Sequence, residues 1–163
     1  MEDGTDEVVS GILMIIVKNT GEKAVQYAEI TLPDSGAFFT LSTLPAGESV
    51  VLLEQTRMAY TGNEDVTQAA ASNMAVFSEP LSLCEDKLQL QILDGALNVI
   101  NISGQDIEGD VVIYYKNAAS DLYYGGITYR VRIEGGLKAD EVKQIMADHF
   151  SASGSKVMFV TVG

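Results

Sequence analysis

The chain contains one pattern twice, and this internal repeat constrains its fold more than any other feature. Residues 17–25 align without gaps with residues 99–107 at a constant offset of 82 positions, so that Asn19 corresponds to Asn101. A repeat unit of about 80 residues can enclose a small core of its own, whereas the repeats of solenoid proteins are usually shorter. We therefore expect two similar domains in tandem.

Further matches follow the asparagines in both copies. Residues 30–32 correspond to residues 112–114, and the turn at residues 44–48 corresponds to residues 137–141. Phe77 and Phe159 also lie 82 positions apart. The offset is larger at the second turn, which indicates an insertion in the second copy. We expect a linker at residues 1–7, domains at residues 8–80 and 86–163, and a junction near residues 79–87.

Both copies have the composition of β-strands separated by turns. β-Branched and apolar segments alternate with turn residues such as Asn19-Thr20-Gly21 and Asp94-Gly95, and the second of these is a strong hairpin signal. Hydrophobic residues make up 47% of the chain, which argues against disorder. The expected fold class is all-β, with two tandem antiparallel β-sandwich domains.

One segment, residues 139–150, gives conflicting signals. Val142, Ile145, Met146 and His149 follow the spacing of a helix, whereas the repeat aligns the same segment with the apolar strand expected at residues 50–53. Both assignments stay open at this point. The repeat favours a strand, because an aligned partner carries more information than a short periodicity.

The charge of the chain excludes some classes of partner. Ten basic residues stand against 23 acidic residues, which gives a formal net charge of −13. Because the basic residues are scattered, the chain lacks the positive cluster that binds nucleic acid or anionic lipid. The most apolar run, residues 11–17, is too short to span a bilayer. We expect no nucleic acid, no direct membrane insertion, and an export segment upstream of residues 1–7.

No pattern in the sequence indicates catalysis. Cys84 and His149 are the only cysteine and the only histidine, and they lie far apart, so nucleophilic catalysis lacks a base partner. Asp106, Glu108 and Asp110 alternate, but the glycine and the terminal glutamate of a calcium loop are missing. We expect no enzyme activity, no catalytic residues, no metal and no cofactor.

A cluster of tyrosines is the one local enrichment that suggests a binding site. It contains five of the seven tyrosines and lies largely in the insertion of the second copy. Exposed tyrosines offer flat amphipathic faces for sugar stacking or protein contact. The candidate binding residues are Tyr115, Asp121, Tyr123, Tyr124 and Tyr129. The alternative, favoured by the preference of tyrosine for strands, is that these side chains cover a core or a sheet edge.

The repeat resembles a known group of modules. An apolar strand that ends at Asn19 or Asn101, followed later by the turn Leu44-Pro45-Ala46-Gly47-Glu48, is similar to the immunoglobulin-like and fibronectin-type modules of bacterial surface proteins, such as CARDB and FxLYD domains. Asp140 stands where the second copy of this turn would have glycine. The resemblance implies two immunoglobulin-like sandwiches, and modules of this kind are exported and usually non-catalytic.

These observations lead to two functional expectations. The first is a non-catalytic module of an exported or cell-surface bacterial protein, which serves as a spacer or protein-interaction unit. The alternative is a carbohydrate-binding module that uses the tyrosine-rich insertion. The expected partner is accordingly a protein or a glycan at the cell surface.

Overall fold

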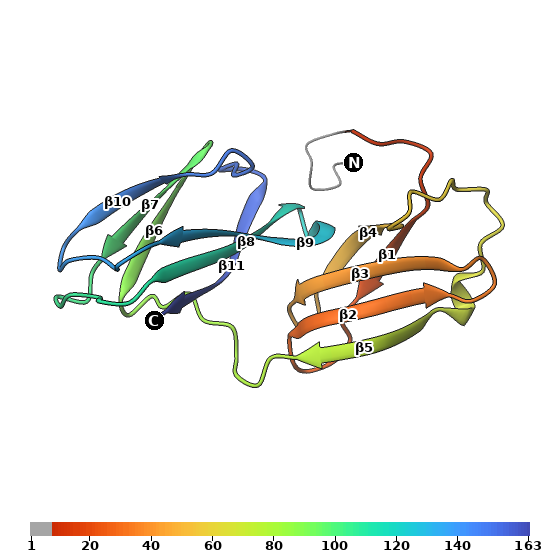
Figure 1. The fold of residues 1–163 in the computed structure, drawn as a ribbon, viewed down its shortest axis with the longest axis horizontal. Helices are drawn as coiled ribbons and strands as arrows, with labels where there is room; N and C mark the ends of the chain where they lie inside the picture. The colour runs from red at the N-terminus through yellow and green to blue at the C-terminus, as the bar shows by residue number, and fades with distance from the viewer. Residues whose placement is uncertain (1–7) are drawn as a thin grey trace. The chain divides into compact units, whose positions relative to one another are not determined.

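The computed structural model describes residues 8–163 and shows an all-β protein (Figure 1). The chain divides into two compact units. Unit 1 contains the chain up to Pro80 together with Ala119–Ile127, and unit 2 contains Leu81–Ala118 and Thr128–Gly163. The expected second domain, residues 86–163, is therefore interrupted, because the tip of its long hairpin belongs to unit 1. The linker expected at residues 1–7 lies outside the described residues.

Unit 1 has two sheets. In the first, β1 (Met14–Lys18) pairs antiparallel with β4 (Ser49–Leu53), and the start of β9 (Leu122–Ile133) adds to β4 in parallel. In the second sheet, β2 (Val25–Leu32) lies between β3 (Ala37–Leu44) and β5 (Ala70–Val76), side by side in Figure 1. A short 3-10 helix, Val66–Gln68, precedes β5.

The core of unit 1 lies between these two sheets. Along β2 and β3, buried residues largely alternate with more exposed ones, as the twofold side-chain period of a strand requires. The buried apolar side chains come from both sheets: Leu13, Ile15, Val50 and Leu52 from the first, and Ala28, Ile30, Leu32, Phe39, Leu41 and Leu44 from the second. The unit is therefore sandwich-like.

Unit 2 also has two sheets. In one, β7 (Ala96–Asn101) lies between β6 (Leu88–Leu93) and β10 (Val142–Met146). In the other, β8 (Val111–Ala119) lies between β9 and β11 (Ser155–Val162). The core includes side chains from both sheets: Leu88, Leu97, Val99, Val111, Ile113, Ile133 and Val160.

The repeat seen in the sequence is also present in the strand register. Ile15 pairs with Leu52 in unit 1, and the corresponding Leu97 pairs with Ile145 in unit 2. Thus β10 occupies the place of β4, and Val142–Met146 is a strand, as the repeat predicts and the helical spacing does not. β1 corresponds in the same way to β7, and β2 to β8.

Asn19 and Asn101 occupy equivalent turns and make equivalent hydrogen bonds. The Nδ2 group of Asn19 donates to the carbonyls of Lys23 (2.9 Å) and Leu44 (3.0 Å). The Nδ2 group of Asn101 donates to the corresponding carbonyls of Gln105 (2.7 Å) and Leu137 (3.2 Å). Each amide therefore connects its own turn to a segment distant in the sequence, which is the end of β3 for Asn19 and the bridge residue Leu137 for Asn101.

The late turn is also the same in both units. Asp140 has φ 60° where Gly47 has φ 78°, so the aspartate adopts the left-handed conformation that glycine adopts in the first copy. The N–H of Asn19 donates to Glu48, and the N–H of Asn101 donates to Glu141. The substitution of glycine by aspartate therefore leaves the turn type unchanged.

The match between Phe77 and Phe159 is not structural. The N–H of Phe77 donates to Ala24, just before β2 begins. Phe159 instead pairs with Tyr114, which corresponds to Leu32 at the opposite end of β2. The equal spacing of these two residues in the sequence is therefore a coincidence.

The position of Ile15 and Ile16 on β1 gives a test of the core. Ile15 is 9% exposed and Ile16 is 69% exposed. We expect Ile15→Ala to lower the free energy of unfolding by about 2–4 kcal/mol, because it leaves a cavity between the sheets. The control, Ile16→Ala, should change it by less than about 0.5 kcal/mol. Chemical denaturation measures both, and equal effects would show that β1 does not face the core as described.

Candidate functional site

Unit 1 contains an apolar groove of about 560 Å³. It lies between the first sheet at β1 and the second sheet at β5. Val17 of β1 lines it together with Val25, Ala28 and Ile30 of β2, Leu41 and Leu44 of β3, and Ala71, Met74 and Val76 of β5. We refer to this set of residues as the β1–β5 groove.

The strand β5 forms the exposed wall of the groove. All seven of its residues are exposed, and Met74 is 63% exposed although it belongs to a strand of a sandwich-like unit. The sequence explains part of this exposure, because Ala70, Ala71 and Ser72 are too small to cover the space beside them. The pairing of β5 with β2 is also interrupted by register shifts, and Asn73 has φ 45°.

The opposite wall is the edge of β1. Among residues 8–163, no strand pairs with β1 on the side away from β4. A free strand edge presents N–H and C=O groups that can bond another chain. The groove is therefore apolar inside and carries backbone hydrogen-bonding groups along one side.

The turn at Asn19 closes one end of the groove. The N–H of Gly21 donates to Oδ1 of Asn19 (3.0 Å), and the Nδ2 group bonds two carbonyls as described above. Charged side chains occur only on this rim, at Lys18, Glu22 and Lys23. The arrangement can hold an apolar segment.

The tyrosine cluster predicted from the sequence is divided between the two units. Tyr115 and Tyr129 belong to unit 2, whereas Asp121, Tyr123 and Tyr124 belong to unit 1. Tyr115 and Tyr123 are buried, Tyr129 is half-buried, and Asp121 and Tyr124 are exposed. The expectation that these tyrosines lie on an open face is therefore wrong for Tyr115 and Tyr123.

The physical reason is that the inserted residues form a hairpin tip that packs into unit 1. Tyr123 pairs with Val50 of β4, and its side chain is 2% exposed. The hydroxyl of Ser42 donates to the carbonyl of Gly126 at 2.8 Å. The insertion therefore contributes to the structure of unit 1.

The tyrosines of unit 2 belong to an aromatic stack. Tyr115 stacks on Tyr129 with ring centroids 5.3 Å apart, and it meets the edge of Phe150 at 4.8 Å. His149 stacks on Tyr129 at 5.3 Å. These geometries are typical of core aromatic pairs, and Tyr115 and Phe150 are buried.

A second cavity of unit 1, of about 250 Å³, is bordered by the buried carboxylate of Glu54. Burial by itself raises the pKa of this carboxyl. Hydrogen bonds from the N–H groups of Met58 and Phe38 and from Thr56 outweigh burial, and the pKa lies below its usual value. A carboxylate with four donors stabilises its loop and is poorly suited to accept a proton.

The alternating carboxylates of unit 2 are engaged in separate contacts. Asp106 accepts hydrogen bonds from Lys138 and from the N–H of Ala139, and Asp110 accepts bonds from the N–H of Gly135 and from Arg132. These bonds lower the pKa of both carboxyls. Over residues 8–163, no group of three His, Cys, Asp or Glu side chains could hold a metal ion.

The residue patterns of unit 1 do not predict the groove, although one comparison between the two copies points to it. The second copy has a strand pattern at residues 88–92 that precedes the repeated segment. The first copy has Asp6-Glu7-Val8-Val9-Ser10 at the aligned positions, without that alternation. The repeat therefore indicated that one copy lacks a strand that the other copy has.

Comparison with known protein families, with curated proteins and with solved structures found no match to this chain. In the part of the chain that the structure describes, no helix is long and apolar enough to cross a membrane.

Tyr123 and Tyr124 are adjacent residues with opposite exposure, at 2% and 39%. We expect Tyr123→Ala to lower the free energy of unfolding by about 3 kcal/mol, because it removes a buried ring. Tyr124→Ala, the matched control, should cost less than about 1 kcal/mol. Thermal and chemical denaturation test this pair. A larger loss in Tyr124→Ala would contradict the placement of the hairpin tip.

Lys116 of unit 2 is fully buried, and burial lowers the pKa of its ammonium group to about 7. In the unfolded chain this pKa returns to its ordinary value near 10.5. Between these values the unfolded state binds more protons, so the free energy of unfolding should rise with pH by up to about 1.4 kcal/mol per unit.

The substitution Lys116→Met isolates this effect, because methionine cannot titrate. We expect the rise in stability between about pH 7 and 10 to be smaller in the variant than in the parent chain. Urea denaturation at a series of pH values provides the measurement. The same pH profile in both proteins would show that Lys116 is not the titrating group.

Proposed function

We propose that this chain is a non-catalytic module of an exported or cell-surface bacterial protein, built from two immunoglobulin-like sandwiches in tandem, and that unit 1 binds a protein partner. The single observation that carries the proposal is the β1–β5 groove, which combines an apolar lining, exposed along β5, with a free strand edge. Large exposed apolar patches on folded proteins usually mark interaction sites.

A protein partner fits the groove better than a glycan does. Sugar-binding sites rely on exposed aromatic faces, and the residues that line the groove are aliphatic or are polar residues of the Asn19 turn. A polypeptide can satisfy both the apolar lining and the backbone groups of β1. The burial of Tyr115 and Tyr123 removes much of the support for the carbohydrate alternative.

The exported, bacterial location rests on the sequence. The resemblance to bacterial surface modules lies in the asparagine turns and the late turns, and these turns have the same geometry in both units. The net charge of −13 repels nucleic acid and anionic lipid. A module between other domains of a surface protein would meet partners through a groove of this kind.

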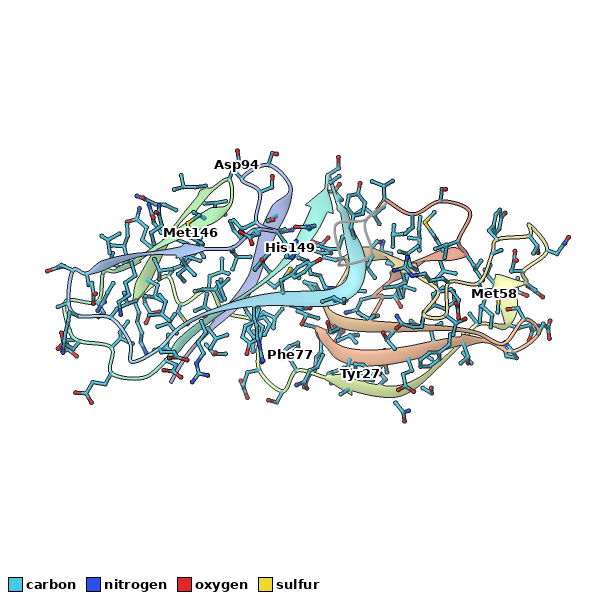
Figure 2. All side chains as sticks on the ribbon, turned by 45° about the horizontal axis from the view of Figure 1, so that its top comes forward. Tyr27, Met58, Phe77, Asp94, Met146 and His149 are labelled. Carbon is cyan, nitrogen blue, oxygen red and sulfur yellow. The ribbon has the colours of Figure 1, made fainter. Side chains whose placement is uncertain are left out.

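Site-specific photo-crosslinking tests the proposal. A photoreactive amino acid is placed at Met74, which lines the groove. The control position is Met146 on β10 of unit 2, which is labelled in Figure 2. Both methionines lie in strands, and they are 63% and 69% exposed. Each purified protein is then illuminated on intact cells of the source organism.

We expect a crosslinked product at position 74 and little or none at position 146. A protease should degrade the crosslinked partner, and a glycosidase should not. Unlabelled parent chain should compete with its formation. The proposal is wrong if the product at position 74 is a glycan, or if both positions crosslink equally or not at all.

A further inference from the structure

Resting on the proposed protein-binding role of the β1–β5 groove, we propose that the partner is an extended segment of a different polypeptide chain that adds to β1 as an antiparallel strand. Its alternate apolar side chains enter the groove. In unit 1 this segment takes the place that β6 occupies in unit 2.

Unit 2 shows how the equivalent edge is completed. β7 corresponds to β1, and β6 pairs with β7 antiparallel, with Leu88 opposite Asn101 and Leu90 opposite Val99. Leu88 is buried in the core of unit 2, and Leu90 packs against it. A strand with apolar residues at alternate positions thus fills the space beside β7.

Unit 1 has no such strand in residues 8–163, and the path of the chain explains why. In unit 2, Asp94 and Gly95 reverse the chain between β6 and β7, at the hairpin tip labelled in Figure 2. The aligned residues Ile12 and Leu13 make no such turn. Ile12 bridges Ala59, and the N–H of Leu13 donates to Met58, so the chain extends β1 on the β4 side.

The backbone groups of β1 alternate in a way that leaves a bonding edge. Asn19 exchanges hydrogen bonds with Gly47 and Glu48, so its N–H and C=O point toward β4. Since the direction alternates along an antiparallel strand, the groups of Met14, Ile16 and Lys18 point to the other side. In unit 2 the corresponding side is bonded, because the N–H of Ile102 donates to Lys87 at 2.8 Å.

The register of β6 specifies the chemistry of the partner. Residues opposite Asn19 and Val17 take the roles of Leu88 and Leu90 and point between the sheets, toward Val25 and Met74 of the groove. The residue between them points outward and is polar, as Gln89 is. The partner therefore carries an apolar–polar–apolar pattern over the three residues opposite Asn19, Lys18 and Val17.

The same sheet already accepts a strand from a distant part of the sequence. Leu122–Tyr124 adds to β4, with Leu122 opposite Ser49. A strand at β1 would continue this sheet on its other side. Residues 1–7 do not have the required pattern, because four of them are acidic and only Met1 is apolar. These seven residues are therefore not the occupant that we propose.

The first experiment is a binding titration with a fluorescent synthetic peptide of residues 86–93, the chain's own β6 sequence. We expect saturable one-to-one binding to the whole chain. Replacing the peptide residues that correspond to Leu88 and Leu90 with serine should weaken binding at least tenfold. In the chain, Met74→Glu should also weaken binding at least tenfold, and Met146→Glu should leave it unchanged.

The second experiment tests the register with a disulfide. The background is Cys84→Ser, because Cys84 is the only native cysteine. Val17→Cys in the chain and Leu90→Cys in the peptide place two thiols at directly opposed, non-hydrogen-bonded positions, where side chains are closest. We expect rapid crosslinking for this pair and at least tenfold slower crosslinking when the peptide carries Gln89→Cys.

The outcomes separate this inference from the proposed function. If position 74 captures a protein on cells but the peptide neither binds nor crosslinks in register, strand addition is wrong and the protein-binding role stands. If position 74 captures no protein, both fail. Self-association of the chain in sedimentation, abolished by Met74→Glu, would make a second copy the occupant and overturn the assignment to a different chain.

Discussion

The buried side-chain amide of one asparagine in each unit holds the architecture together. Asn19 and Asn101 each bond the carbonyl four residues ahead and a carbonyl distant in the sequence, which is that of Leu44 at the end of β3 or that of Leu137 in the bridge with Ile107. A buried carbonyl left without a donor costs roughly 1–3 kcal/mol, so the amide fixes where strand and turn meet. The closed end of the β1–β5 groove depends on this contact.

The two units share one plan and differ at their sheet edges. In unit 2, β6 pairs with the edge of β7 that lies away from β10, and its side chain Leu88 belongs to the core. In unit 1, Leu122–Tyr124 covers β4, whereas no described strand covers β1. Because a free edge beside an apolar groove binds another strand readily, this difference makes unit 1 the candidate for function.

Two buried charged residues show how the fold treats ionisable groups away from the groove. Glu54 keeps its charge because four donors surround it, which lowers its pKa against the effect of burial. For Lys116, burial dominates and the pKa falls to about 7. Both residues belong to the structure of their units, and the groove itself relies on shape and backbone bonding.

Residue patterns predict the all-β class, the repeat, the equivalent turns at Asn19 and Asn101, and the strand at Val142–Met146. These features depend on local residue patterns, which a sequence displays directly. Two features are visible only in the folded structure: the inserted hairpin tip with Tyr123 packs into unit 1, and among the described residues no strand pairs with the edge of β1 away from β4. Both features depend on contacts between segments that are distant in the sequence. Local residue patterns do not specify which of these segments pack together, so they predict neither the burial of Tyr123 nor the groove.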